Sequence, residues 1–264
     1  MIGLNYLGRM GQLGNQMFQY AALRGIAAKR GYGYTIPDHN ERIKDSLGNI
    51  LRIELFDVFD IHPEQTGYLL ADGVRSEVDF HFDEDILENC PDNVTLVGYF
   101  QTEKYFKHIE DEIRSDFDFH DELLIPAKDI SSQWREPIAL HIRRTDYLTN
   151  PNHSELPMPY YEKALTEFDK NRDVIIFSDD PDWCMANQLF DSDRFMVSQT
   201  ENNHMDLCLM SLCKDHIIAN SSFSWWGAWL GKNNQVIAPK NWFLGSNNHH
   251  LNVSDLIPDN WKKI

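Results

Sequence analysis

Short apolar segments alternate with helical segments over the C-terminal half of the chain, and this alternation restricts the fold more than any other feature. Consecutive parallel strands need a crossover between them, usually a helix. The alternation therefore predicts a parallel sheet built from βαβ units. Strands are expected at residues 138–142, 174–177, 195–198, 216–220 and 235–238, and helices at 160–169, 182–190, 203–213 and 224–230.

The N-terminal end of the chain predicts a second unit of the same kind. Residues 2–7 are an expected strand, and a glycine-containing turn covers residues 8–14. A helix is expected from Asn15, as its N-cap, to about Arg30, with Gly31 as its stop. Further strands are expected at 32–36 and 94–100 and a helix at 103–116, whereas 37–93 is acidic, turn-rich and weakly periodic.

The polar segment at residues 120–136 separates the two patterns and predicts two domains. Their expected bounds are residues 1–128 and 129–264, and the last ~20 residues are a candidate to pack back on the first domain. The predicted fold class is therefore α/β.

The chain carries 24 lysines and arginines against 41 aspartates and glutamates, a formal net charge of −17 over 264 residues. Such acidity argues against nucleic acid as a partner, because phosphate backbones are bound by basic surfaces. It also argues against broad adhesion to anionic membranes. An anionic small ligand remains compatible with it, because its site needs only a few local cations.

No targeting segment is expected. No apolar run approaches the roughly 20 residues that span a bilayer, and residues 1–7 lack the basic flank and cleavage site of a signal peptide. We therefore expect a cytoplasmic protein, any membrane association being peripheral and at the inner face. The cysteines form no CxxC pair and are expected to be reduced and mostly buried: Cys90, Cys184, Cys208 and Cys213.

Ligands of open parallel sheets bind outside the carboxyl ends of the strands, so the residues after each strand are the candidate site. The strand at 138–142 is followed by Arg143, Arg144, Thr145 and Asp146. A guanidinium offers donors in a rigid fork that suits phosphate oxygens. Because side chains alternate along a strand, we expect one arginine to face the ligand and the other to orient a carboxylate. The alternative is a pair of surface salt bridges.

Two further segments suit an anion. After the strand at 216–220, Ser221 and Ser222 precede a helix whose N-terminal N–H groups attract anions. The tryptophans of that helix are expected to be core residues. The turn at 8–14 also suits a polyphosphate, but it matches neither a P-loop nor GxGxxG, so a tight turn with an Asn cap is its alternative.

Aspartates follow the strand at 174–177, where Asp180 and Asp182 have a spacing that suggests a metal site. The same spacing recurs at residues 83 and 85, 116 and 118, and 191 and 193. In so acidic a chain the pattern carries almost no weight, and acids also suit the positive end of a helix. We predict no metal site.

Five motifs in order resemble the α-1,2-fucosyltransferases of glycosyltransferase family eleven. The resemblance covers nearly the whole chain, and its motifs lie at residues 11–20, 98–106, 141–147, 177–180 and 221–227. It implies a GT-B fold, in which two Rossmann-like domains face each other across a cleft. Residues 1–128 would be the acceptor-side domain, and residues 129–264 would bind GDP-fucose.

The family implies an inverting, metal-independent transfer of L-fucose from GDP-β-L-fucose to O2 of a terminal galactoside, in surface-glycan biosynthesis. By this resemblance Arg143 holds the β-phosphate, Arg144 braces the site, and His141 and Asp206 contact the nucleoside. Asn15 contacts the diphosphate or the fucose. The expected donor-binding residues are Gly14, Asn15, Gln16, His141, Arg143, Asp179, Asp206, Ser221, Ser222 and Phe223.

Arg143, Arg144 and Asp146 are the expected catalytic residues. Asp146 is the first candidate for the base, although neighbouring arginines weaken a carboxylate in that role. It would otherwise hold Arg144, with a carboxylate from the N-terminal half as the rival base. Two other functions stay open: a fucosyltransferase of another linkage, such as α-1,6, and a non-catalytic sugar-nucleotide or glycan-binding relative.

Overall fold

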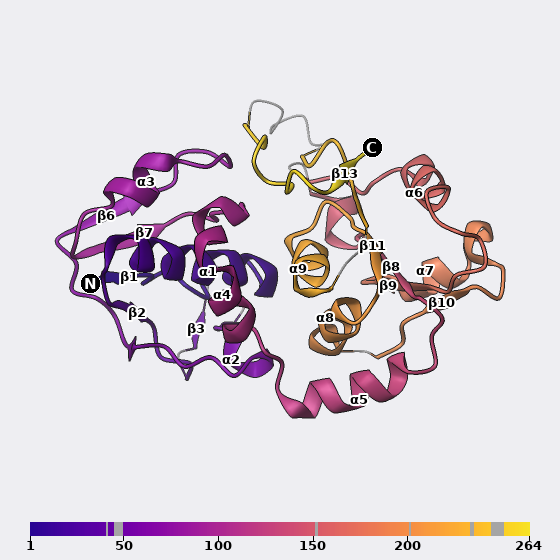
Figure 1. Ribbon diagram of the computed structural model, residues 1–264, viewed down its shortest axis with the longest axis horizontal. Helices are drawn as coiled ribbons and strands as arrows, with labels where there is room; N and C mark the ends of the chain where they lie inside the picture. The colour runs from indigo at the N-terminus through magenta and orange to yellow at the C-terminus, as the bar shows by residue number, and fades with distance from the viewer. Residues whose placement is uncertain (41, 45–49, 151–152, 201, 233–234, 244–250) are drawn as a thin grey trace. The chain divides into compact units, whose positions relative to one another are not determined.

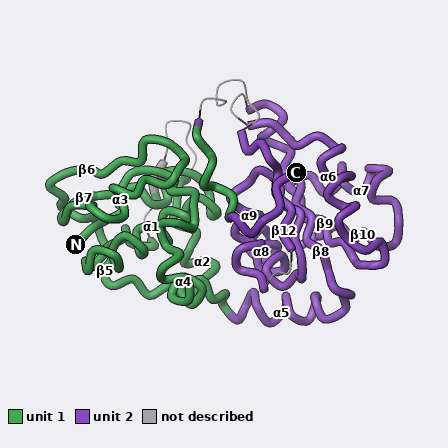
Figure 2. The backbone as a smooth tube through the Cα atoms, turned by 45° about the horizontal axis from the view of Figure 1, so that its top comes forward, with its two compact units in different colours: residues 1–120, 252–258 green, residues 121–251, 259–264 purple. Residues whose placement is uncertain are grey.

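The computed structural model describes residues 1–40, 42–44, 50–150, 153–200, 202–232, 235–243 and 251–264 (Figure 1). These residues form two compact units (Figure 2). Unit 1 comprises Met1–His120 and Asn252–Pro258, and unit 2 comprises Asp121–Leu251 and Asp259–Ile264. The division precedes helix α5 (Asp121–Ser131), so residues 121–128, which we assigned to the first domain, belong to unit 2.

Unit 2 is built on a parallel sheet with the strand order β10-β9-β8-β11-β12-β13. Its strands are β8 (Ile138–Ile142), β9 (Val174–Ser178), β10 (Phe195–Val197), β11 (Asp215–Ile217), β12 (Val236–Ala238) and β13 (Lys262–Lys263). Every strand expected in this half is present. Strand β13 was not expected, because it consists of two exposed lysines at the sheet edge and has no apolar pattern.

The helices of unit 2 follow the expected alternation. They are α5, α6 (Met158–Leu165), α7 (Pro181–Met185), α8 (Asn203–Ser211) and α9 (Ser222–Leu230), with 3-10 turns η3 (Asp146–Leu148) and η4 (Gln188–Phe190). The expectation of one helix over residues 182–190 is wrong. Asn187 has an extended backbone and caps the following turn through its side chain, which accepts the N–H of Leu189.

The core of unit 2 lies on its sheet. Ile138, Leu140, Val174 and Ile176 are fully buried in one cluster with the aromatic rings of α6. Trp225, Trp226 and Trp229 of α9 are buried, and the Trp225 ring packs against that of Trp261, 5.3 Å away. The prediction that these tryptophans are core residues is confirmed. The four cysteines are free and buried, as also expected.

Unit 1 also holds a parallel sheet, in the order β5-β2-β1-β7-β6. Its strands are β1 (Ile2–Gly3), β2 (Tyr34–Ile36), β5 (Gln65–Thr66), β6 (Gly73–Ser76) and β7 (Val94–Val97), and β3 (Ile43–Lys44) pairs with β4 (Ile50–Leu51) in a separate hairpin. Its helices are α1 (Leu13–Arg30), α2 (Leu55–Val58), α3 (Glu84–Asn89) and α4 (Glu110–Asp116), with 3-10 turns η1 (Glu103–Tyr105) and η2 (Lys107–Ile109). The single helix expected over 103–116 is thus three short segments.

Helix α1 begins earlier than expected. Gln12 is its N-cap, so the expectation of Asn15 at that position is wrong. The Asn15 side chain is occupied elsewhere, since its oxygen accepts the Gln101 side-chain amide at 2.8 Å. The expected stop is confirmed: Gly31, with φ of 66°, donates to carbonyls of the last turn. Among the described residues, no helix is long and apolar enough to cross a membrane.

Replacing Gly25 by alanine tests how closely α1 packs on the η1–η2 segment. A methyl group there would lie 2.0 Å from the Tyr105 carbonyl oxygen and 2.8 Å from the Phe106 Cα. Because backbone atoms cannot rotate away, we expect Gly25→Ala to lower the free energy of unfolding by about 3 kcal/mol in urea titrations. The control Gly73→Ala, whose methyl would meet only Val94 at 3.9 Å, should change it by less than about 0.5 kcal/mol. Equal values for both variants would contradict this packing.

Candidate active site

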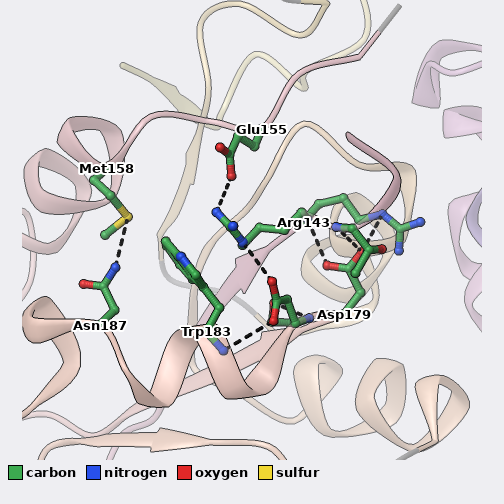
Figure 3. A network of polar contacts seen from close by, with 10 residues as sticks. Arg143, Glu155, Met158, Asp179, Trp183 and Asn187 are labelled. Carbon is green, nitrogen blue, oxygen red and sulfur yellow. Dashed lines mark hydrogen bonds and ion pairs between the residues drawn. The ribbon is translucent and has the colours of Figure 1, made fainter. Parts of the chain in front are cut away.

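The carboxyl ends of three neighbouring strands bring most of the expected site residues together. Strands β9, β8 and β11 are adjacent in the sheet of unit 2. The segments that follow them carry Asp179, the arginine pair, and the turn from Asn220 into α9. Figure 3 shows the polar contacts around Arg143, Asp179 and Glu155.

Asp179 holds the chain where it leaves β8. Its Oδ1 accepts the backbone N–H of Arg144 at 2.8 Å, and its Oδ2 accepts the N–H and the hydroxyl of Thr145 at 3.1 and 2.5 Å. Burial alone would raise the pKa of Asp179, but the Thr145 hydrogen bond and the charge of Arg143 outweigh it, so this pKa lies below its ordinary value. The carboxylate is therefore ionised at neutral pH and fixes the loop.

Arg144 is enclosed by protein groups. Its Nε donates to Asp180 at 3.1 Å, and its Nη1 donates to Glu155 at 2.5 Å. The guanidinium carbon lies 3.9 Å from the centre of the Trp183 ring, and only 13% of the side chain is exposed. Two carboxylates and an aromatic ring thus compensate its charge, which gives Arg144 a bracing position.

Arg143 is held along one edge and left open along the other. Its Nε lies 2.9 Å from Asp146 and 3.4 Å from Asp179, and its guanidinium carbon lies 5.7 Å from the centre of the Tyr147 ring. Within the part of the chain that the structure describes, neither terminal nitrogen has an acceptor. The two N–H groups of that open edge are available to an anion.

Asp146 pairs with Arg143 and not with Arg144, so the alternative that it holds Arg144 is wrong. The 3-10 turn η3 starts at Asp146 and directs the Asp146 carboxylate back toward Arg143, three residues earlier. Its side chain is 52% exposed. The contact fixes the orientation of the Arg143 fork.

The turn after β11 lies beside the arginine loop. The Tyr147 hydroxyl donates to the carbonyl of Asn220 at 3.0 Å, and the Asn220 amide donates to the carbonyls of Ser154 and Trp242. Ser221 is the N-cap of α9 and makes no capping bond through its side chain. The first N–H groups of α9 point out of the helix end, as in known anion sites; Ser222 and Phe223 start that helix.

His141 is buried at the end of β8, with its ring centre 5.8 Å from that of Phe223. Burial is the main cause that lowers its pKa to about 3, and the charge of Arg143 adds to it. The ring is therefore neutral at physiological pH. Its buried Nδ1 has no partner among the described residues. The neutral ring can therefore form one hydrogen bond with a ligand, but it cannot supply a positive charge.

Asp206 lies apart from this network. From the first turn of α8, its Oδ1 accepts the hydroxyls of Ser198 and Thr200 at 2.5 and 2.9 Å. Burial raises its pKa, and these hydrogen bonds only partly oppose that. No contact among the described residues joins Asp206 to the arginines, so its nucleoside role stays a prediction.

Gly14, Asn15 and Gln16 belong to unit 1, in the first turns of α1. Gln16 is buried, and its amide is already occupied: it donates to the carbonyls of Gly11 and Arg52 and accepts the N–H of Glu54. These bonds hold the loops around the start of α1. A donor contact by these residues stays a prediction.

Among the described residues, no group of histidine, cysteine, aspartate or glutamate side chains could hold a metal ion. Asp180, which suggested a metal from its spacing, instead accepts the N–H of Trp183 at the start of α7 and binds Arg144. Independence from metal stays a prediction about the reaction.

Solved fucosyltransferase structures resemble the whole fold. POFUT1 in complex with GDP-fucose superposes with a TM-score of 0.57 at 12% identity, over 90% of this chain and 97% of that one. A variant of Arabidopsis thaliana FUT1 in complex with GDP gives 0.54 at 9% identity, over 90% and 69%. The fold is the GT-B type of glycosyltransferase, with two Rossmann-like units, as predicted.

The sequence comparisons are more specific. The model of glycosyl transferase family 11 matches residues 1–264. The O-antigen biosynthesis glycosyltransferase WbnK of Escherichia coli is 31% identical over 94% of this chain and 97% of its own length. An α-1,2-colitosyltransferase of Escherichia coli is 32% identical over 96% of both. The galactoside α-(1,2)-fucosyltransferase 1 of Sus scrofa is 27% identical over 83% of this chain and 63% of its own length. The chain belongs to glycosyltransferase family 11.

Sequence reasoning missed the residues that complete the site. Glu155 and Trp183 enclose Arg144, and Tyr147 lies between Arg143 and the Asn220 turn. Tyr147 follows the arginine motif directly, so its position was a usable signal. Glu155 lies in a loop without a pattern, and only the fold brings it to Arg144.

Replacing Asp179 by asparagine tests its hold on the arginine loop. We expect Asp179→Asn to lower the free energy of unfolding at pH 7 by about 1–3 kcal/mol, because hydrogen bonds to a charged group are lost. A carboxyl with a lowered pKa stabilises the fold above its unfolded pKa and loses this effect as pH falls. The difference from the wild type should therefore shrink below pH 3.8, the ordinary value of Asp.

Urea titrations between pH 7 and pH 3 measure this difference. Asp182→Asn is the control, since Asp182 is exposed in the first turn of α7, and its effect should stay below about 1 kcal/mol. A difference for Asp179→Asn that does not change with pH would show that its charge is not what holds the loop.

Proposed function

We propose that this protein is an inverting glycosyltransferase that transfers L-fucose from GDP-β-L-fucose to O2 of a terminal galactoside during the synthesis of a surface glycan such as an O-antigen. The family supports it, and so do the relatives, one of which is an O-antigen biosynthesis glycosyltransferase and another a galactoside α-(1,2)-fucosyltransferase. The observation that carries it is the open edge of Arg143, which lies at the end of β8.

Direct displacement at the sugar builds negative charge on the departing nucleoside diphosphate. Preorganised donors aimed at that charge are usually the largest catalytic contribution. Arg143 offers two free N–H groups, and the α9 N-terminus offers backbone N–H groups and the positive end of the helix dipole. Asp179 and Asp146 hold Arg143 in place, so little reorientation is needed when the charge develops.

The remaining expected contacts fit around this diphosphate site. Neutral His141 and Phe223 would face the nucleoside side of the donor, and Arg144 would keep the loop in shape from behind. Asp206, Ser221 and Ser222 are further candidates for donor contact. We expect the enzyme to act in the cytoplasm. Any contact with membrane-borne acceptors would be made by a local patch of its surface.

The identity of the sugar is the finer part of the proposal. One relative is a colitosyltransferase and another a fucosyltransferase. The test is incubation with GDP-fucose or GDP-colitose and a panel of galactosides, followed by assignment of the product linkage by NMR. A 2-O-fucosylated galactoside supports the proposal, and a product with another linkage or with colitose alone contradicts it. Tight donor binding without turnover would favour a non-catalytic relative.

Replacing Arg143 tests the phosphate role. We expect Arg143→Ala to lower kcat by about 100–1,000-fold with the fold intact, the usual effect of removing one donor to a developing charge. The control Arg135→Ala removes an exposed arginine that precedes β8 at the other end of the strand, and its kcat should equal that of the wild type. Steady-state kinetics and circular dichroism measure both, and near-normal turnover by Arg143→Ala would remove the phosphate role.

Chelation tests the absence of a metal requirement. If Arg143 and the α9 N-terminus supply the positive charge, EDTA should leave the transfer rate unchanged, and added Mg²⁺ or Mn²⁺ should not raise it. A large loss in EDTA that either ion restores would overturn the metal-free mechanism.

A further inference from the structure

The two elements that offer positive charge to a diphosphate, Arg143 and the N-terminus of α9, follow different strands of unit 2. Arg143 comes directly after β8, and the turn into α9 comes after β11, which is the neighbour of β8 in the sheet. Residues beyond the end of a strand are not held by the strand pairing. The separation of these two elements must therefore be fixed by other contacts.

Tyr147 contacts both elements. The guanidinium carbon of Arg143 lies 5.7 Å from the centre of the Tyr147 ring, which is within the range of a cation–π interaction. The Tyr147 hydroxyl donates to the backbone carbonyl of Asn220 at 3.0 Å. Asn220 directly precedes Ser221, the N-cap of α9. One side chain therefore extends from the arginine fork to the residue before the helix cap.

The Tyr147 ring is itself held in place. It stacks on the ring of His153, with the ring centres 5.0 Å apart and the planes inclined by 17°. The His153 ring also packs against that of Phe243, at 5.3 Å between centres. Burial raises the pKa of Tyr147 to about 12, and the charge of Arg143 opposes this only in part. The hydroxyl is therefore protonated at neutral pH and acts as a hydrogen-bond donor.

The acceptor of this hydrogen bond is also a fixed point. Asn220 is only 1% exposed, and its side-chain amide donates to the carbonyls of Ser154 and Trp242 at 3.2 and 3.0 Å. Ser154 precedes Glu155, whose carboxylate binds Arg144. The turn before α9 is thus connected to the second arginine as well, and it cannot shift without disturbing these contacts.

We propose that Tyr147 is a positioning residue of the donor site, which fixes Arg143 relative to the N-terminus of α9 so that both act on one diphosphate. This inference rests on the proposed function. Preorganised donors stabilise a developing charge because they need no reorganisation during the reaction. Donors on two separate loops meet this condition only if their separation is fixed. In this role Tyr147 acts through Arg143 and the helix end and does not need to touch the substrate.

Tyr147→Phe removes the hydroxyl and keeps the ring that packs on His153. We expect kcat with GDP-fucose to fall by about 10–100-fold, because a displacement of about 1 Å in a catalytic site can cost that much. The affinity for GDP alone, measured by calorimetry, should fall by about 2–10-fold, because part of the binding energy must then order the two elements. A variant with wild-type kcat and wild-type GDP affinity would contradict the proposal.

A purely structural role is the competing explanation, since the loss of a hydrogen bond destabilises a fold. Tyr105→Phe in unit 1 is the matched control. The Tyr105 hydroxyl accepts the backbone N–H of Asp83 at 3.0 Å, so this variant also loses one hydrogen bond between a tyrosine hydroxyl and the backbone. Both variants should melt at a lower temperature than the wild type, but only Tyr147→Phe should lose kcat and GDP affinity. Equal losses in the control would overturn the positioning role.

A double variant tests whether Tyr147 acts through Arg143. Two substitutions with independent effects lower kcat by the product of their separate factors. If Tyr147 acts by positioning Arg143, its hydroxyl matters little once Arg143 is absent. We therefore expect Arg143→Ala combined with Tyr147→Phe to have the kcat of Arg143→Ala alone, within about twofold. A double variant that is slower by the full factor measured for Tyr147→Phe would contradict a role through Arg143.

The outcomes separate this inference from the proposed function. If the wild type neither binds GDP nor transfers fucose to any galactoside, the proposed function fails and the positioning role fails with it. If the wild type does both and Tyr147→Phe equals it in both, only the positioning role is overturned. If the wild type binds GDP but transfers a different sugar, the proposed function is contradicted, and the GDP affinity of Tyr147→Phe still supports or overturns the positioning role.

Discussion

The carboxylate of Asp179 is the interaction on which the candidate site depends. It binds two successive backbone N–H groups and a hydroxyl of the loop after β8, and it faces Arg143. The neighbouring strand thereby fixes where the arginine loop leaves the sheet. Arg144 then turns toward Asp180 and Glu155, and Arg143 is left with one open edge. A chain with a net charge of −17 thus presents a local cation whose effect reaches only about a Debye length, roughly 8–10 Å.

Burial decided how much of the fold could be predicted. The strands of unit 2 are apolar because both of their faces are covered, so each expected strand is present. Strands β13 and β6 show no such apolar run. Strand β13 consists of two exposed lysines. Strand β6 lies at the sheet edge, its residues alternate between partly buried and exposed, and Val74 is more than half exposed. Helix ends were less predictable, because Asn15 makes a tertiary contact with Gln101 in place of the cap that its residue type favours.

At the site, residue types were predictable and their pairings were not. The arginine motif indicates an anion site, and the family resemblance implies that Asp179 is a site residue. The 3-10 turn η3 brings Asp146 to Arg143, and a loop without a recognisable pattern brings Glu155 to Arg144. Neither pairing can be read from the residue types.

The C-terminal end of the chain contributes residues to both units. Residues 252–258 belong to unit 1, where Asp255 accepts the N–H of Phe82 and pairs with Lys104, while residues 259–264 return to unit 2 and add β13 to its sheet. Neither unit is therefore one continuous piece of chain. A recombination event with a single crossover therefore cannot exchange one unit intact between two chains of this architecture.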